Sequence, residues 1–209
     1  MVYSKKYYTK KNHSDNLDFL QKKFLILNNK FPVFSNYYFQ LFKVLNKIPL
    51  NGKVLDIGIA SGTFVNFLRK IRPDLKFVGL DLTEISDLLP KNIKFIKADA
   101  TKFKLKEKFD FIICNHLFEH LPVGDVSKVI INIEKHLTKN GYFWFTTPTF
   151  SKAFFNDPTH IRPYNKESMK RLLIMYGLKN YKLFEGYYFT FPLYYLKWSL
   201  KISYGYIRK

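Results

Sequence analysis

Asp56, Gly58 and Gly62 form a pattern that suits the binding of a nucleotide-sized ligand. Residues 54–62 read Val-Leu-Asp-Ile-Gly-Ile-Ala-Ser-Gly, an apolar run that carries one carboxylate and then turns. Glycine tolerates the positive φ angles and the close backbone approach that such a turn requires. The segment from Thr63 onward has apolar residues at helical spacing, so the turn would deliver a helix N-terminus to the carboxyl end of a strand. This order of elements is typical of a nucleotide site.

Polar residues also follow the next three apolar runs of the sequence. Residues 75–80 end at Asp81, about 20 residues beyond the glycine turn, a distance at which an acid can accept hydrogen bonds from a ribose diol. Two further runs end in the same way, residues 93–97 before Asp99 and residues 109–114 before Asn115. Four such strands with helical patterns between them predict one parallel sheet, with its site along the carboxyl edge.

This combination resembles the class I S-adenosylmethionine-dependent methyltransferases over roughly residues 50–209. The resemblance implies a Rossmann-like three-layer α/β/α sandwich, with a seven-stranded, mostly parallel sheet whose last strand is antiparallel. It also implies an enzyme that uses S-adenosylmethionine as its cofactor. Residues 1–49 are then expected to be a basic tail and helices that pack on the domain. A nicotinamide-dependent dehydrogenase shares the acid after the second strand, but its turn has a different glycine spacing.

The resemblance assigns a role to each polar residue at the predicted edge. Asp56, Gly58 and Gly62 would form the loop around the methionine part of the cofactor. Ala60 stands at the middle position, where the family most often has glycine, and its methyl group would leave less room for the cofactor. The remaining cofactor contacts are expected from Asp81 to both ribose hydroxyls, Leu82 to the adenine face, Asp99 beside Ala100 to the adenine amino group, and Asn115 near the sulfonium.

A polar loop after the predicted fifth strand, residues 142–146, carries the candidate catalytic residue. It contains Asp157-Pro158-Thr159-His160, which does not fit regular structure, and relatives with small-molecule or glycan substrates have a similar loop there. The imidazole of His160 is suited to take the proton of a hydroxyl group as that group attacks the methyl carbon, and His120 is a second candidate. The alternative is that His160 only orders its own loop.

The same histidines support a second interpretation, a divalent-metal site. His116, Glu119 and His120 stand at spacing i, i+3 and i+4, and His160 would approach from the later loop. Metal-dependent RNA ribose 2′-O-methyltransferases are similar here, with Glu in place of His116. Glu-His is nevertheless common in metal-free methyltransferases, and the sequence lacks a recognisable RNA-binding module. We therefore expect catalysis without a metal, with a non-catalytic homologue, which Ala60 makes conceivable, as a further alternative.

The composition constrains the partners less than the motifs do. The net charge of +19 would attract RNA or anionic lipid, but the lysines are scattered along a sequence that is also rich in Asn, Ile, Phe and Tyr, as AT-rich coding would produce. We expect O-methylation of a small molecule or of a saccharide- or lipid-linked intermediate, with nucleic acid not favoured. The single Cys114, the lack of a signal-peptide pattern and the lack of a membrane-spanning run suggest a cytoplasmic enzyme.

The remaining patterns predict the elements that surround the sheet. Helices are expected over residues 15–29, 36–46, 124–137 and 166–176, the last of them ended by Gly177. Lys139-Asn140-Gly141 is expected to end the third of these helices and to start the fifth strand. Residues 180–188 and 202–209 are expected to form an antiparallel pair. The aromatic segment 189–201 between them would be a lid, a peripheral membrane contact or a packed appendage.

Overall fold

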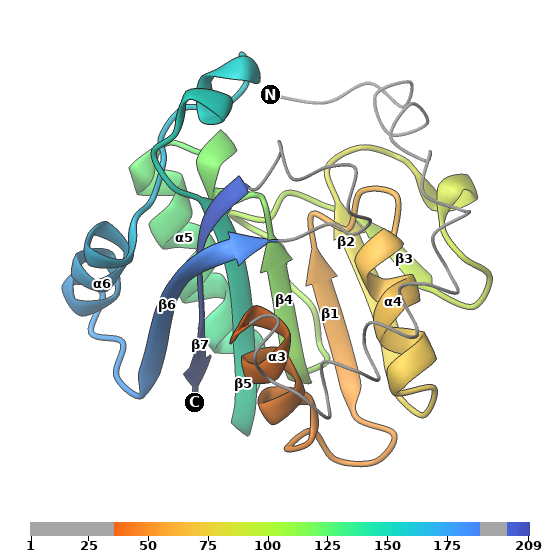
Figure 1. Ribbon diagram of the computed structural model, residues 1–209. Coiled ribbons are helices and arrows are strands. Elements are labelled where there is room, and N and C mark those ends of the chain that lie inside the picture. The colour runs from red at the N-terminus through yellow and green to blue at the C-terminus, as the bar shows by residue number, and fades with distance from the viewer. Residues whose placement is uncertain (1–35, 189–199) are drawn as a thin grey trace.

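The computed structural model describes residues 36–188 and 200–209, and strands alternate with helices along most of this length (Figure 1). The elements in chain order, with η for a 3-10 helix, are α3 (Asn36–Leu45), β1 (Lys53–Ile57), α4 (Thr63–Ile71), β2 (Lys76–Asp81), η2 (Ser86–Leu88), β3 (Lys94–Lys97), β4 (Phe109–Asn115), η3 (Phe118–His120), α5 (Val123–His136), β5 (Leu137–Pro148), η4 (Lys152–Asn156), α6 (Lys166–Met175), β6 (Tyr181–Tyr188) and β7 (Leu200–Arg208). The four predicted strands agree with β1 to β4 to within one residue at each end. The predicted helix 15–29 and most of the aromatic segment lie outside the described residues.

The strands form one seven-stranded sheet in the order β3-β2-β1-β4-β5-β7-β6. The first five strands pair in parallel, and β7 is antiparallel to both of its neighbours, β5 and β6. This confirms the predicted sheet with its antiparallel last strand. Because the chain builds outward from β1 to β3 and then returns to β4, the strand order reverses between β1 and β4. Ligands of open α/β sheets bind outside the carboxyl ends of the strands at such a switch point.

Helices cover both faces of the sheet and give it three layers (Figure 1). One core cluster holds the buried faces of α5 and α6, and the other holds those of α3 and α4. Successive residues of β5 show how one strand serves both cores, because Phe143 and Phe145 belong to the first cluster and Trp144 belongs to the second. This burial on both faces explains why the strands read as continuous apolar runs.

The junction between α5 and β5 corrects one prediction. Residues 139–141 do not end the helix, since α5 already ends at His136 and β5 begins at Leu137. Leu137 is buried and pairs with Phe109, and the β4–β5 register shifts immediately after that pair. Gly141 lies in this irregular stretch, where an added Cβ would lie 3.0 Å from the Phe109 carbonyl oxygen. The glycine therefore permits a close approach of two strands and does not act as a helix stop.

Two further predictions concern the residue that ends α6 and the burial of the cysteine. Gly177 follows α6 with a φ of +69°, the left-handed conformation that commonly ends a helix, as predicted. Cys114 is fully buried in β4, also as predicted. Within the described ranges, none of the helices combines the length and the apolar character needed to cross a bilayer.

Candidate active site

The turn after β1 has the backbone conformation that its glycines predicted. Gly58 and Gly62 have φ angles of +74° and +69°. The Gly58 N–H donates a hydrogen bond of 2.8 Å to the Leu80 carbonyl, which attaches the turn to the end of β2. Ala60 also has a positive φ, +50°, a conformation that costs an L-residue about 1–2 kcal/mol. This cost gives a backbone reason, besides the extra methyl group, why glycine would be favoured at position 60.

Asp81 links this turn to the turn after β2. Its buried carboxylate accepts hydrogen bonds from the Ala60 N–H, at 3.2 Å, and from the Thr83 N–H, at 2.9 Å. Each carboxylate oxygen can accept more than one hydrogen bond, so these two bonds do not prevent a contact with a ligand hydroxyl. Sequence reasoning gave Asp81 only a ligand-binding role and missed this structural one, because the Ala60 N–H lies 21 residues away along the chain.

Asp56 is the second buried acid at this edge of the sheet. Burial, together with the nearby Asp81, raises the pKa of Asp56 to about 8. The Asp56 carboxyl group therefore holds its proton at neutral pH. A buried carboxyl group beside a second acid favours a ligand that brings hydroxyl donors or positive charge.

The residues predicted to contact an adenine ring follow β2 and β3. Leu82 is 43% exposed although it directly follows a buried strand. Asp99 accepts hydrogen bonds of 2.8 and 2.7 Å from the Thr101 N–H and hydroxyl, and Lys102 lies 3.4 Å away. Burial opposes ionisation of Asp99, but these Thr101 and Lys102 contacts outweigh it and lower its pKa. The adjacent Ala100 is half-buried.

Asn115 ends β4 beside the glycine turn, at the switch point of the sheet. Its Oδ1 accepts a 3.0 Å hydrogen bond from the Thr146 hydroxyl on β5. The backbone reverses at the next residue, His116, which has a φ of +54° and donates its N–H to the Thr146 carbonyl at 3.0 Å. Thr146 thus orients the predicted ligand residue. The two consecutive threonines at the carboxyl end of the predicted fifth strand were the sequence signal for this role.

Glu119 joins the loop after β4 to two later segments. Its carboxylate is 1% exposed and accepts hydrogen bonds from His116 Nδ1 at 3.1 Å and from the Thr147 hydroxyl at 3.3 Å. Its backbone carbonyl accepts a 2.6 Å hydrogen bond from the Ile161 N–H. Glu119 therefore anchors the loop that carries His160. Only Phe118–His120 form a helical turn here, a 3-10 turn, and His116 precedes it.

His160 is held by a hydrogen bond to a backbone carbonyl and by tilted contacts with two neighbouring rings. Its Nδ1 lies 2.7 Å from the Phe154 carbonyl oxygen, which can only accept, so Nδ1 carries a proton and Nε2 carries the lone pair of the neutral ring. The ring centroids of Phe154 and His120 lie 4.6 and 4.8 Å from that of His160. With its side chain 14% exposed, His160 is a restrained imidazole with an available acceptor atom.

His120 is oriented in the same way by Thr159. The Thr159 hydroxyl donates its proton to Asp157, so at 3.1 Å it can only accept from His120 Nδ1. Burial lowers the pKa of His120, against the raising effect of the Glu119 carboxylate. His120 is therefore neutral at neutral pH, with its lone pair on Nε2.

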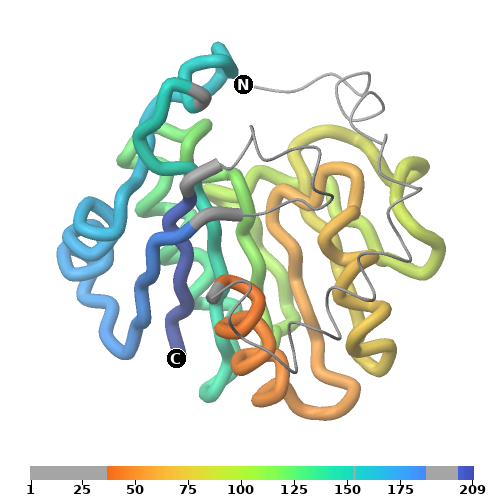
Figure 2. The backbone as a smooth tube through the Cα atoms, viewed as in Figure 1, coloured from red at the N-terminus to blue at the C-terminus, as the bar shows by residue number. Residues whose placement is uncertain are grey.

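Glu119, His120 and His160 converge. One potential ligand atom from each lies within 4.8 Å of the other two. The predicted four-residue metal set thus becomes three in the described part of the chain, because His116 turns its Nδ1 to Glu119 and is absent from this group. The turn after β1 and the loop after β5 lie along the same edge of the sheet, at the top of Figure 2.

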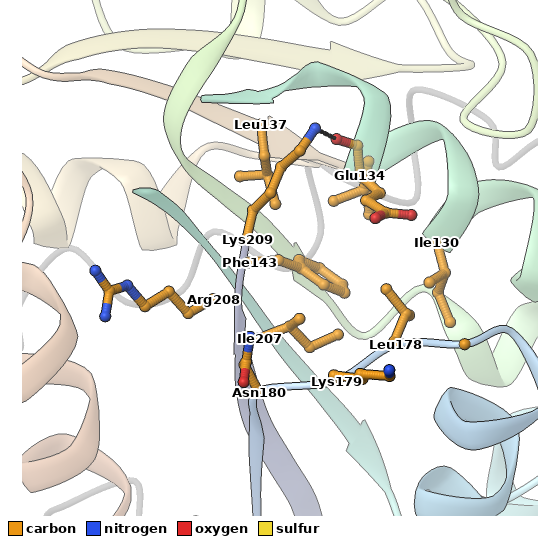
Figure 3. A pocket seen from close by; sticks show the side chains of 12 residues that line it. Ile130, Glu134, Leu137, Phe143, Leu178, Lys179, Asn180, Ile207, Arg208 and Lys209 are labelled. Atoms are coloured by element: carbon orange, nitrogen blue, oxygen red, sulfur yellow. Dashed lines mark hydrogen bonds between the residues drawn. The ribbon is translucent and has the colours of Figure 1, made fainter. Parts of the chain in front are cut away.

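A separate cavity of about 190 Å³ lies at the opposite edge of the sheet (Figure 3). It is lined by the end of α5, residues of β5, the segment after α6 and the end of β7. Its inner wall is apolar, as Figure 3 shows for Ile130, Phe143, Leu178 and Ile207. Its volume is below the roughly 300 Å³ of typical ligand sites, and it contains none of the predicted site residues.

Comparisons with known proteins agree with this arrangement. A family model described as a methyltransferase domain matches residues 35–183, well over half of the chain. Among curated proteins, a malonyl-[acyl-carrier protein] O-methyltransferase from Bacillus anthracis is 28% identical over 101 residues, which cover 46% of this chain and 37% of the relative. The match thus extends over little more than a third of that relative.

Solved structures match over more of the chain. A S-adenosylmethionine-dependent methyltransferase from Archaeoglobus fulgidus has a TM-score of 0.60 at 17% identity, covering 89% of this chain and 99% of that one. The N-methyltransferase NodS from Bradyrhizobium japonicum, in complex with S-adenosyl-L-homocysteine, has a TM-score of 0.57 at 18% identity, covering 81% and 84%. At such identities these matches establish the fold.

Proposed function

The chain belongs to the methyltransferase domain family, and from this premise we propose that it transfers the methyl group of S-adenosylmethionine to an oxygen atom of a small-molecule acceptor. The acceptor class includes saccharide- and lipid-linked intermediates. The observation that carries the proposal is the pair of buried acids, Asp56 and Asp81, beside a turn with three positive φ angles at the switch point of the sheet.

The residues at this edge fit S-adenosylmethionine. Asp81 has acceptor capacity for the ribose hydroxyls, and Leu82 offers an exposed apolar side chain beside it. Asp99, whose pKa is lowered, is an ionised acceptor that suits an amino group. The pKa of Asp56 is raised, and a ligand with a cationic ammonium group would lower it again by favouring the ionised carboxylate. When bound, S-adenosylmethionine supplies an electrophilic methyl group on a sulfonium centre.

The acceptor is expected beside His160. Its Nε2 is the atom that takes the proton of the acceptor hydroxyl, while the Phe154 carbonyl holds Nδ1 and fixes the ring. Glu119 and Thr159 position the two histidines. Most of the rate acceleration then comes from holding the acceptor oxygen in line with the methyl group in a site with little water. His160 is a catalytic residue in this proposal, and His120 is a second candidate.

Two observations favour an apolar or amphiphilic acceptor that attacks the methyl group through an oxygen atom. Phe150 precedes η4 and Phe155 lies within it, and the two side chains belong to residues that are 73% and 63% exposed, with ring centroids 5.8 Å apart. The relative from Bacillus anthracis is named for O-methylation of malonyl-[acyl-carrier protein]. A peripheral membrane contact would also use these aromatic side chains.

A screen for the methyl acceptor tests the proposal. The purified chain is incubated with isotope-labelled S-adenosylmethionine and with a cell extract separated into small-molecule, lipid and RNA fractions. We expect the label as an O-methyl group in the small-molecule or lipid fraction. Label in RNA that requires an added divalent metal ion would contradict the proposal and would support a metal-dependent RNA methyltransferase. S-adenosylmethionine binding without transfer to any fraction would support a non-catalytic homologue.

A further inference from the structure

We propose that Glu119, His120 and His160 bind a zinc ion, and that bound zinc inhibits methyl transfer by occupying His160. The binding rests only on the geometry of the three side chains. The inhibition rests in addition on the proposed function, in which His160 is the base.

The first argument is the composition of the cluster. Two imidazoles and one carboxylate, with one potential ligand atom of each within 4.8 Å of the others, are a set of three protein ligands of the kind found in open zinc sites. Nitrogen ligands favour zinc and similar transition metals over magnesium and calcium, which prefer oxygen. Tetrahedral zinc with bonds of about 2.1 Å requires ligand atoms about 3.4 Å apart. The irregular segment that carries His160 would have to move inward slightly.

The second argument is the orientation of the two rings. His160 Nδ1 donates to the Phe154 carbonyl at 2.7 Å, and His120 Nδ1 donates to the Thr159 hydroxyl at 3.1 Å. Metal-binding histidines typically donate one ring N–H to such an acceptor, which directs the lone pair of the other nitrogen to the metal. Both rings already have the Nδ1 contact, which leaves Nε2 as the nitrogen that would bind the metal ion.

The third argument is charge. The Glu119 carboxylate is buried, and its two hydrogen-bond donors, His116 and Thr147, leave it further acceptor positions. The Asp157 carboxylate adds a second negative group, with Oδ2 3.9 Å from His160 Nε2. The negative charges of these two carboxylates would balance the charge of a divalent cation bound at this point.

Zinc binding would affect methyl transfer because the metal ion and the acceptor's proton would use the same nitrogen atom. His160 Nε2 has one lone pair, which can accept the acceptor's proton or coordinate a metal ion, but cannot do both. Zinc at the cluster would therefore remove the base from the reaction. Removal of the zinc would restore it.

Calorimetric titration of the full chain with zinc chloride, without S-adenosylmethionine, tests the binding. We expect one zinc ion to bind, and we expect His160→Ala and Glu119→Gln each to weaken binding at least tenfold. Glu167→Gln, which removes an exposed carboxylate on α6, and titration with magnesium chloride are the matched controls. Zinc affinity unchanged in both cluster variants, or no binding by the unmodified chain, would overturn the site.

Two additions make the test independent of folding and of the acceptor. If His160→Ala does not fold by circular dichroism, His160→Gln replaces it, and cobalt(II) absorption bands report the ligand set directly. In the methyl-transfer assay we expect zinc to inhibit and EDTA to restore activity, with no effect of EDTA on zinc-free enzyme. Loss of activity on EDTA treatment of that enzyme would overturn the inhibitory role, whereas failure to find an acceptor leaves the calorimetric result standing.

Discussion

At the residue scale, the two histidines of the site come from different loops, but their rings are oriented by the same kind of hydrogen bond. Each imidazole has its Nδ1 hydrogen-bonded by an acceptor from the loop after β5, the Phe154 carbonyl for His160 and Thr159 for His120. The tautomers are therefore set by contacts that involve neither ligand nor metal. A substitution of His160 is therefore expected to remove the base without changing the residues proposed to bind the cofactor.

Replacing His160 makes that separation measurable. We expect His160→Ala to lower kcat at least about a hundredfold, the range typical of general-base catalysis, and to leave the Kd of S-adenosylmethionine nearly unchanged. Turnover is measured as S-adenosylhomocysteine release, and cofactor affinity by calorimetry. A variant with normal kcat would mean that His160 only orders its loop.

The titration of Asp56 leads to a prediction about stability and pH. The pKa of Asp56 is about 8 in the folded chain and 3.8 in the absence of burial. Between these values the folded state holds a proton that the unfolded state releases, so the free energy of unfolding falls as the pH rises from about 4 to about 8. Asp56→Asn removes this dependence. Urea unfolding between pH 4 and about pH 8 should show that the free energy of unfolding declines more steeply with pH for the unmodified chain than for Asp56→Asn. Equal slopes for the two chains would contradict the buried, protonated carboxyl group.

At the element scale, the turn after β1 is the segment whose conformation the site depends on most. Gly62 has a φ of +69°, and an added Cβ would lie 3.0 Å from Pro90 Cδ and 3.1 Å from Leu89 Cδ2. We expect Gly62→Ala to reduce the free energy of unfolding by about 1–2 kcal/mol. Gly124→Ala in α5 is the matched control, because no atom lies within 4 Å of its added Cβ and alanine favours the helix.

Urea unfolding of both variants checks this expectation. Gly124→Ala should equal or exceed the unmodified chain in stability, while Gly62→Ala should fall below it and bind S-adenosylmethionine more weakly. If the two variants had the same stability, the positive φ at Gly62 would not constrain the turn.

The elements themselves were largely predictable, and their contacts at the site were not. Apolar runs bounded by polar residues predicted β1 to β4, because strands that are buried on both faces consist mainly of apolar residues. The start of β5 differs from the predicted residue 142, because Gly141 permits a close approach of two strands and does not stop a helix. The sequence contains no local signal for a hydrogen bond such as that of His120 to Thr159, whose partners are 39 residues apart.

At the scale of the whole molecule, the strand order determines which of these residues can act together. The return of the chain from β3 to β4 places Asn115 next to β1, and the pairing of β4 with β5 adds Thr146 and the loop that carries His160. The polar residues were therefore predictable as a set, since the carboxyl ends of parallel strands share one edge. The sequence did not predict that His116 would be absent from the candidate metal ligands, because its position depends on the conformation of the loop after β4.

The net charge of +19 belongs to this scale too, and it assigns no partner by itself. Several described lysines are already engaged locally, as Lys53 and Lys94 are with Glu107. Surface pairs of this kind contribute about 0–1 kcal/mol each, so they do not set the fold or its stability. The choice between a small-molecule and an RNA acceptor rests instead on the screen with labelled S-adenosylmethionine.

The binding of S-adenosylmethionine to Asp81→Ala, measured by calorimetry, tests the central claim most directly. Hydrogen bonds to a charged group contribute about 1.5–3 kcal/mol, so we expect at least a tenfold loss of affinity while thermal unfolding still shows a folded chain. Asp125→Ala on α5, which loses an exposed carboxylate paired with Lys128, should bind like the unmodified chain. Unchanged S-adenosylmethionine affinity in Asp81→Ala, together with binding of NAD by the unmodified chain, would contradict the assignment.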